Sequence, residues 1–137
     1  DIPGTAAAVF GPLSEKGILV DMIVQNTSLD GRTDITFTIP RKDLRQTLEI
    51  MEDVAPRTGA SEVIHDVSVA KVSAIGVGMR NHSGVAARAF SALTQESINI
   101  LMISTSEIKI TILIQEKYVE LAVRILNDAF GLDWDID

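Results

Sequence analysis

The chain has 137 residues, of which 46% are hydrophobic and only 4% aromatic, with a formal net charge of -7 and a pI near 4.7. This acidic balance argues against nucleic acid or an anionic membrane as the main partner, because both select a basic surface. Cysteine is absent and no apolar run approaches 18 residues, so the sequence predicts neither disulfides nor a membrane span and fits a cytoplasmic setting.

The first half of the chain predicts helix, strand, strand, helix and a last short strand. Because the chain starts at Asp1 without methionine, we interpret it as a fragment or as a chain that lacks its first residues. Apolar residues recur at helical or alternating spacing, and Gly17, the Asp30-Gly31 pair and Pro40 separate the elements. The predicted elements are helix 5–16, strand 18–25, strand 33–39, helix 43–54 and strand 62–67.

The second half repeats this order behind a strand of its own. The predicted elements are strand 69–79, helix 84–96, strand 99–104, strand 107–114 and helix 118–130. An acidic tail, residues 133–137, closes the chain.

The two halves are related by an internal repeat of 80 positions. Identical residues stand at both ends of this interval across a helix and the following strand, without a gap. A repeat of this kind indicates a duplicated domain. The identical pairs are Gly4 and Gly84, Ala6 and Ala86, Ala7 and Ala87, Phe10 and Phe90, Leu13 and Leu93, Ile18 and Ile98, Met22 and Met102, and Ile23 and Ile103.

This order of elements predicts an α+β fold with two ferredoxin-like βαββαβ domains, residues 1–67 and 68–137. Each would have an antiparallel sheet with both helices on one face. Two strands are missing from the pattern, the opening strand of the first domain and the final strand of the second. The final strand is missing unless residues 134–136 supply it.

No catalytic, metal or cofactor site is predicted. The glycines of residues 76–78 lack the spacing of a phosphate-binding loop and are interpreted as loop glycines at a strand end. The aspartates of the tail lack the glycine and glutamate of a calcium loop. His65 and His82 have neither metal-ligand spacing nor a nucleophile that would make a triad.

A binding site for a free amino acid is the sharper of two interpretations of Asp21. Backbone N–H groups at the helix N-terminus after Gly4 suit a carboxylate. Asp21, Gln25 and Asn26 at the end of the next strand would take an ammonium group and polar atoms. The alternative is that Asp21 is only an edge-strand charge facing solvent. In the second copy Leu101 replaces it, so the two sites are not equivalent.

Five segments together resemble the regulatory region of bacterial aspartate kinases, a tandem pair of ACT domains. They are Asp-Ile-Pro-Gly at 1–4, Val-Asp-Met-Ile-Val-Gln-Asn at 20–26, Thr-Asp-Ile-Thr-Phe-Thr-Ile-Pro at 33–40, Val-Ala-Lys-Val-Ser-Ala-Ile-Gly-Val-Gly-Met at 69–79, and Ile-Ser-Thr-Ser-Glu-Ile-Lys-Ile at 103–110. This resemblance covers essentially the whole chain.

The resemblance implies feedback inhibition of aspartate kinase, in lysine and threonine biosynthesis, by bound lysine or threonine or both. It implies a homodimer, association with the kinase catalytic domain or subunit, and effectors held between the first ACT domain of one chain and the second of its partner. It also implies that the first domain is inserted into the second, whose remaining strand comes from residues ahead of Asp1. Carried over by motif, the first-domain contacts are Asp1, Gly4, Ala6, Ala7, Asp21, Gln25, Asn26 and Thr36, and the second-domain contacts are Asn99, Ile100, Ser106 and Glu107.

The sequence supports three functional hypotheses. The leading one is an amino-acid-binding regulatory module without a catalytic site of its own. The second is a structural dimerisation module whose ACT pair binds no ligand, which the apolar composition of two small domains suggests. A small ferredoxin-like enzyme is the weakest, because no acid–base constellation is found.

Overall fold

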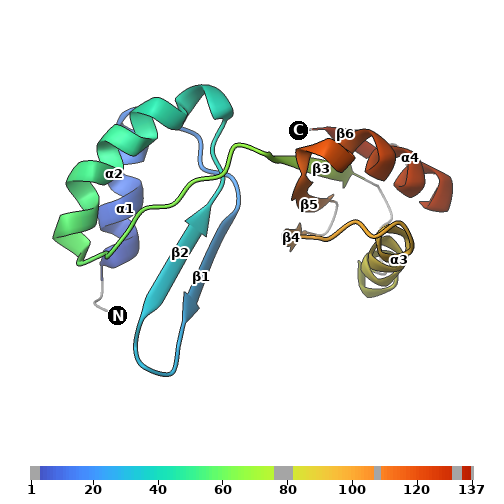
Figure 1. The fold of residues 1–137 in the computed structure, drawn as a ribbon, viewed down its shortest axis with the longest axis horizontal. Coiled ribbons are helices and arrows are strands. Elements are labelled where there is room, and N and C mark those ends of the chain that lie inside the picture. Colours follow the sequence, from blue (N-terminus) through green and yellow to red (C-terminus); the bar gives the residue numbers. More distant parts are fainter. Residues whose placement is uncertain (1–3, 76–81, 107–108, 131–133, 137) are drawn as a thin grey trace. The chain divides into compact units, whose positions relative to one another are not determined.

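The computed structural model describes residues 4–75, 82–106, 109–130 and 134–136. The chain divides into two compact units, Asp1–His65 and Asp66–Asp137, which are described separately (Figure 1). In chain order the elements are α1 (Thr5–Glu15), β1 (Ile23–Thr27), β2 (Thr33–Phe37), the 3-10 turn η1 (Arg41–Asp43), α2 (Leu44–Thr58), β3 (Val69–Ile75), α3 (His82–Gln95), β4 (Met102–Thr105), β5 (Lys109–Gln115), the 3-10 turn η2 (Glu116–Tyr118), α4 (Val119–Phe130) and β6 (Trp134–Ile136).

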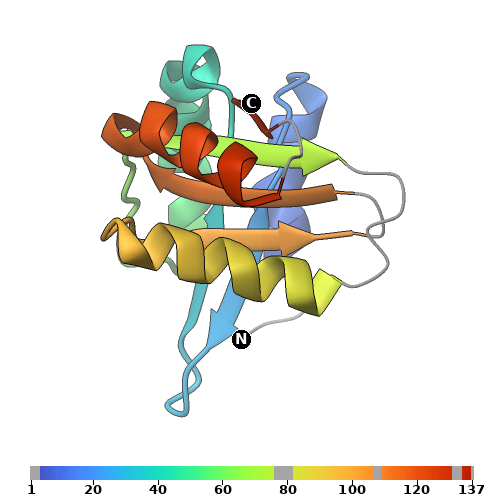
Figure 2. The same ribbon diagram turned by 90° about the vertical axis from the view of Figure 1, so that its right-hand side faces the viewer.

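The second unit is a complete ferredoxin-like domain. Its four strands form one antiparallel sheet in the order β4-β5-β3-β6, which is the order that a βαββαβ unit produces. Figure 2 shows α3 and α4 on the same face of this sheet. The predicted fold class is therefore confirmed. The final strand, which the sequence left open, is Trp134–Ile136, paired with β3 through Ala74 and Trp134.

Alternating side chains of the central strands build the core of the second unit. Fully buried isoleucines of β5 face small and branched residues of the two helices. Burial of each such side chain contributes about 1.5–3 kcal/mol, so this cluster dominates the stability of the unit. Its central members are Val72, Ala74, Ala89, Leu93, Ile110, Ile112, Ile114, Ala122 and Leu126.

The first unit has α1 and α2 side by side against a two-stranded hairpin of β1 and β2 (Figure 1). The core lies between helices and hairpin. Leu13 and Val54 are its most buried residues, and the ring of Phe10 meets that of Phe37 edge to face with 5.2 Å between centroids. The predicted alternation of the strand at 33–39 is confirmed, because Ile35, Phe37 and Ile39 all pack against this core.

The prediction of a strand at residues 62–67 is wrong. These residues have no strand assignment, and Val63, Ile64 and Val67 are exposed. By the order of the second sheet, this segment would occupy the place of β6, beside an equivalent of β3. The described residues of the first unit contain no equivalent of β3, so the segment has no neighbour with which to form a ladder.

Several predicted boundaries shift for a local reason. The strand predicted from residue 18 begins only at Ile23, and two backbone hydrogen bonds between described residues join the segment before it to its neighbour. Asp21 N–H donates to the Thr38 carbonyl at 3.2 Å, and Thr38 N–H donates to the Met22 carbonyl at 3.0 Å. The helix predicted to end at 54 continues to Thr58 and ends at Gly59, which has a φ of 78°.

The duplication extends to individual hydrogen bonds. Leu101 N–H donates to the Leu113 carbonyl as Asp21 N–H does to that of Thr38. The two donors, Asp21 and Leu101, are 80 positions apart, whereas the two acceptors, Thr38 and Leu113, are 75 positions apart. The first unit therefore has five more residues between donor and acceptor than the second. The turns η1 and η2 begin at residues 41 and 116, which are also 75 positions apart, so the two copies keep this offset after their second strands.

Helices α1 and α3 end in the same turn but with different residues. Gly17 has a φ of 70° and Ser97, in the same place, a φ of 58°. Ile18 N–H donates to the Leu13 carbonyl at 3.0 Å, and Ile98 N–H to the Leu93 carbonyl at 2.9 Å. Serine is strained in this left-handed conformation, where glycine has no Cβ penalty.

We expect Ser97→Gly to raise the free energy of unfolding by about 0.5–1 kcal/mol, because relief of left-handed strain exceeds the added entropy of the unfolded chain. Urea denaturation of the variant and the unchanged chain measures the difference. Gly17→Ser is the matched control and should lower stability by a similar amount. Equal stability of all three chains would contradict the assignment.

A buried hydroxyl in α2 gives a second test. Thr47 is 4% exposed, and its Oγ1 has no hydrogen-bond partner among the described residues. The equivalent position of α4 holds Ala122, which is fully buried.

Thr47→Val should raise the free energy of unfolding by about 1 kcal/mol, because it keeps the volume and removes an unsatisfied polar group. Thermal unfolding measures the change. Thr58→Val is the control, since the Thr58 hydroxyl donates to the Ala55 carbonyl at 3.0 Å and its loss should lower stability. Destabilisation by Thr47→Val would show that its hydroxyl has a partner.

Candidate functional site

The first half of the candidate site is the N-terminus of α1. Gly4 precedes the helix with a φ of 95° and contributes no capping side chain, and the first turn contains no acidic residue. Ala6 and Ala7 in that turn are exposed. Among the described residues no side chain caps the positive end of the helix dipole, which suits an external carboxylate.

The register of the hairpin divides the predicted strand residues between two faces. Gln25 lies opposite Ile35 and so shares the face that packs on the helices. Asn26 lies opposite Asp34, and Thr36 opposite Val24, on the other face. The structure therefore places Gln25, but not Asn26 or Thr36, on the same side of the hairpin as α1.

Asp21 stands on an exposed rim of the first unit, ahead of β1. Buried and exposed side chains are interleaved around it, since Ile18 and Met22 are only 6% and 5% exposed whereas Leu19 is 69% exposed. Met22 N–H donates to the Thr38 hydroxyl at 3.0 Å, which holds this segment extended. Exposure of Asp21 is compatible with both interpretations of the residue, an edge charge and a ligand contact.

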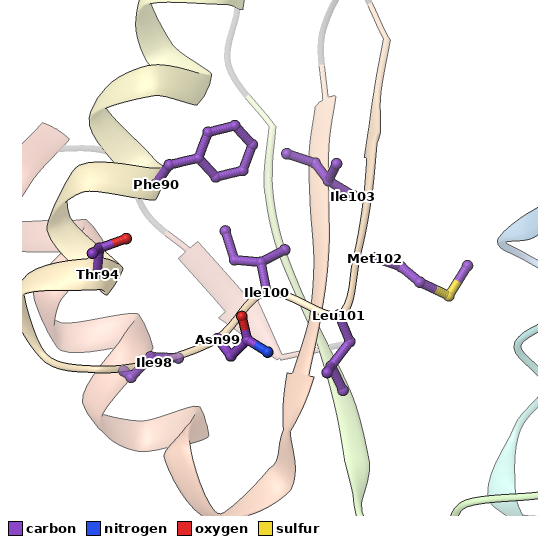
Figure 3. Close-up of a pocket in the computed structure, with 8 residues that line it drawn as sticks. All are labelled: Phe90, Thr94, Ile98, Asn99, Ile100, Leu101, Met102 and Ile103. Carbon is purple, nitrogen blue, oxygen red and sulfur yellow. The ribbon is translucent and has the colours of Figure 1, made fainter.

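The second half of the candidate site is a cavity of about 420 Å³ in the second unit. Figure 3 shows Phe90 and Thr94 of α3 on one side of it and the segment 98–103 on the other. Two predicted contacts, Asn99 and Ile100, are part of this lining.

The other predicted second-domain contacts lie elsewhere. Ser106 is at the hairpin between β4 and β5, where its N–H donates to the Lys109 carbonyl at 2.8 Å and its hydroxyl accepts from Lys109 N–H at 3.2 Å. Asp1 and Glu107 lie outside the described residues. The contact set carried over by motif therefore remains a prediction.

Sequence reasoning missed three apolar residues of the cavity, Phe90, Leu101 and Ile103, which are 39%, 42% and 36% exposed. A signal was available, because Phe90 and Ile103 are identical to Phe10 and Ile23 in the repeat. These identities indicate a duplicated domain, and the exposure of the residues in the structure shows that they line a surface cavity.

Among the described residues no group of histidine, cysteine and acidic side chains could hold a metal ion. Within the same ranges no helix is long and apolar enough to cross a membrane.

The hairpin that follows Gln25 and Asn26 is ordered by its own side chains. The hydroxyl of Ser28 donates to a carboxylate oxygen of Asp30, and Arg32 N–H donates to the same oxygen at 3.1 Å. These bonds, that of Ser28 first, hold the pKa of Asp30 below its ordinary value.

Ser28→Ala should raise the pKa of Asp30 toward that ordinary value, because the largest stabilisation of the charged carboxylate is lost. A lowered pKa adds stability above the unfolded pKa, and this is lost as the pH falls through the folded pKa. An NMR titration of the Asp30 carboxyl carbon measures the shift, with Ser14→Ala as the control. An unchanged titration would assign the lowered pKa to Arg32 instead.

Comparison with known proteins identifies the family of this arrangement. The family model described as "ACT domain" matches residues 1–54 and 72–130. The aspartokinase of Pseudomonas aeruginosa is 56% identical over 133 residues, which are 97% of this chain and 32% of that protein. The chain thus spans about a third of the length of the curated relatives that it matches.

Solved structures agree. A crystal structure of aspartokinase alpha and beta subunits is 52% identical, with a TM-score of 0.89 over 96% of this chain and 86% of that chain. The ligand-free regulatory subunit of aspartate kinase from Thermus thermophilus is 40% identical, with a TM-score of 0.87 and coverage of 95% and 86%. Escherichia coli aspartokinase III in complex with lysine and aspartate, in the T-state, is 26% identical with a TM-score of 0.68, over 94% of this chain and 28% of that one.

Proposed function

Because the chain belongs to the ACT-domain regulatory regions of aspartate kinases, we propose that it binds free threonine or lysine, or both, and mediates feedback inhibition of the kinase. The kinase activity belongs to a catalytic domain or subunit with which this chain associates. The setting is the cytoplasm, where a chain without cysteine needs no disulfides.

One observation carries the proposal: among the described residues the N-terminus of α1 has no capping side chain, in the unit that also exposes Asp21. A helix end without a capping side chain attracts a carboxylate. An exposed aspartate attracts an ammonium group. A free α-amino acid has both groups on one carbon, so this pair of features matches its chemistry rather than that of a simple anion or cation.

The comparisons support an amino acid as the effector class. Escherichia coli aspartokinase III, whose regulatory part this chain resembles in fold, was crystallised with lysine and aspartate in its T-state. The replacement of Asp21 by Leu101 in the second copy supports one charged site per pair of units.

The mechanism needs only a difference in affinity. An amino acid that binds the inhibitory arrangement of the enzyme more tightly than the active one shifts the population toward the inhibitory one. A coupling of about 1–3 kcal/mol changes the equilibrium roughly 5- to 150-fold, which is enough for feedback control.

A second candidate function is a dimerisation module without a ligand. The exposed apolar side chains of Leu19, Ile23, Leu101 and Ile103 favour it, because such residues gather at protein interfaces. The two functions are compatible, since effectors held between two chains require a dimer. They differ in whether an amino acid binds at all.

Calorimetric titration of the chain with threonine and lysine, alone and together, tests the proposal. We expect binding of at least one of them, weakened about tenfold or more by Asp21→Asn, because a charge-assisted hydrogen bond is lost. Asp34→Asn is the matched control, since Asp34 is also exposed in the same unit and should leave affinity unchanged. Absence of heat and of thermal stabilisation with either amino acid would leave the dimerisation module as the function.

A further inference from the structure

The loop that joins β1 to β2 (Figure 1) contains Asp30-Gly31, the sole aspartate in the sequence that is followed by glycine. No asparagine in the sequence precedes a glycine. An aspartate in this position is chemically reactive, because the next backbone nitrogen can attack the side-chain carboxyl group and glycine has no Cβ to obstruct the attack. The loop therefore contains a reactive pair whose products can be assigned to one place in the chain.

The reaction of such a pair conserves atoms and consumes only water. The nitrogen of Gly31 forms a bond to Cγ of Asp30, and the carboxyl hydroxyl leaves as water with the amide proton, which gives a cyclic succinimide. Water then opens the ring at either carbonyl. Opening at Cγ restores aspartate, whereas opening at the main-chain carbonyl leaves isoaspartate, whose backbone runs through Cβ and Cγ and has an additional carbon.

We propose that Asp30-Gly31 is a protected site of isoaspartate formation, which the closed turn keeps unreactive and which opening of the hairpin releases. The attacking nitrogen is engaged, since Gly31 N–H donates to the Ser28 carbonyl at 3.0 Å. The carboxylate is engaged too, because one oxygen accepts from the Ser28 hydroxyl and, at 3.1 Å, from Arg32 N–H. The closed turn thus holds both reacting groups in other hydrogen bonds.

The charge of Asp30 adds to this protection. A neutral carboxyl group is the better electrophile, because its hydroxyl leaves as water, whereas an ionised carboxylate resists attack. The Ser28 hydroxyl, and after it Arg32 N–H, lower the pKa of Asp30 and so favour the ionised form. Arg32 Nε also lies 3.7 Å from the second carboxylate oxygen, although both side chains are exposed and solvent screens this pair.

The turn itself requires the reactive glycine. Gly31 has a φ of 85°, in the left-handed region where a side chain is strained. An added Cβ would meet no atom of the described residues within 4 Å, so conformation rather than space selects glycine. A bulkier residue would slow the attack but strain the turn. The hairpin therefore keeps glycine, and Ser28 acts as a positioning residue that protects it.

Isoaspartate would open the hairpin at its closed end. Ser28 N–H donates to the Arg32 carbonyl at 2.8 Å, beside the cross-strand pair of Thr27 and Thr33. An additional backbone carbon lengthens the loop that this bond closes, so the bond and the adjacent register are lost. The damage would reach β1, the strand of Gln25, whether or not an amino acid binds there.

Ageing of the purified chain tests the proposal. The unchanged chain, Ser28→Ala and the chain unfolded in urea are incubated near neutral pH, and isoaspartate is measured by enzymatic methylation and peptide mapping. We expect the unfolded chain to react fastest, and Ser28→Ala to react several-fold faster than the unchanged chain. Ser28→Thr keeps a hydroxyl and should retain the protection. Ser14→Ala, which removes an exposed hydroxyl from α1, is the matched control and should age as the unchanged chain does.

Asp30→Glu locates the reaction, because its longer side chain would have to close a larger ring and the isoaspartate signal should disappear. A signal that persists in this variant would overturn the site. Equal ageing of Ser28→Ala and the unchanged chain, with circular dichroism showing both folded, would overturn the protection, as would a folded chain that ages as fast as the unfolded one. Calorimetry with amino acids is independent of these outcomes, so failure of the effector proposal is distinguishable.

Discussion

Two helix-ending hydrogen bonds set the geometry on which the candidate site depends. Ile18 N–H bonds to the Leu13 carbonyl and Ile98 N–H to the Leu93 carbonyl, and all four side chains are buried. With the chain extended after this bond, burial of residue 18 or 98 fixes which way the next three side chains face. The first must face outward, the second inward, and the third outward again. The exposure of residues 19, 21, 99 and 101 therefore follows from the packing of Ile18 and Ile98 in the two cores.

The periodicity of apolar residues predicted the elements whose side chains pack in the core. It failed for segments that form a strand only where a neighbouring strand is present to pair with them. The helices and the strand of Ile35 and Phe37 follow from apolar spacing, and both are found. The segment with Val63 and Ile64 has strand composition but no ladder partner among the described residues, so composition misled. Trp134–Ile136 forms a strand despite its acidic sequence, because β3 is available beside it and pairs with it.

The candidate site was predictable in its polar parts and less so in its apolar parts. Asp21 and Gly4 attract notice because a charge in an apolar strand and a glycine before a helix need an explanation. Phe90 and Leu101 do not attract notice, because an apolar residue at a regularly spaced position is expected to be part of the core. Only their exposure shows that they line a cavity. The register of the hairpin also cannot be predicted from composition. It places Gln25 on one face of the hairpin and Asn26 and Thr36 on the other.

Divergence of the two copies gives the duplication a physical use. Among the described residues, the core cluster of the first unit contains five buried residues against eleven in the second, so less apolar burial holds the described part of the first unit. A ligand or a second chain that binds its rim would contribute a larger share of its total stability. The first unit also exposes Asp21, so an amino acid bound there, as proposed, would stabilise this unit by mass action.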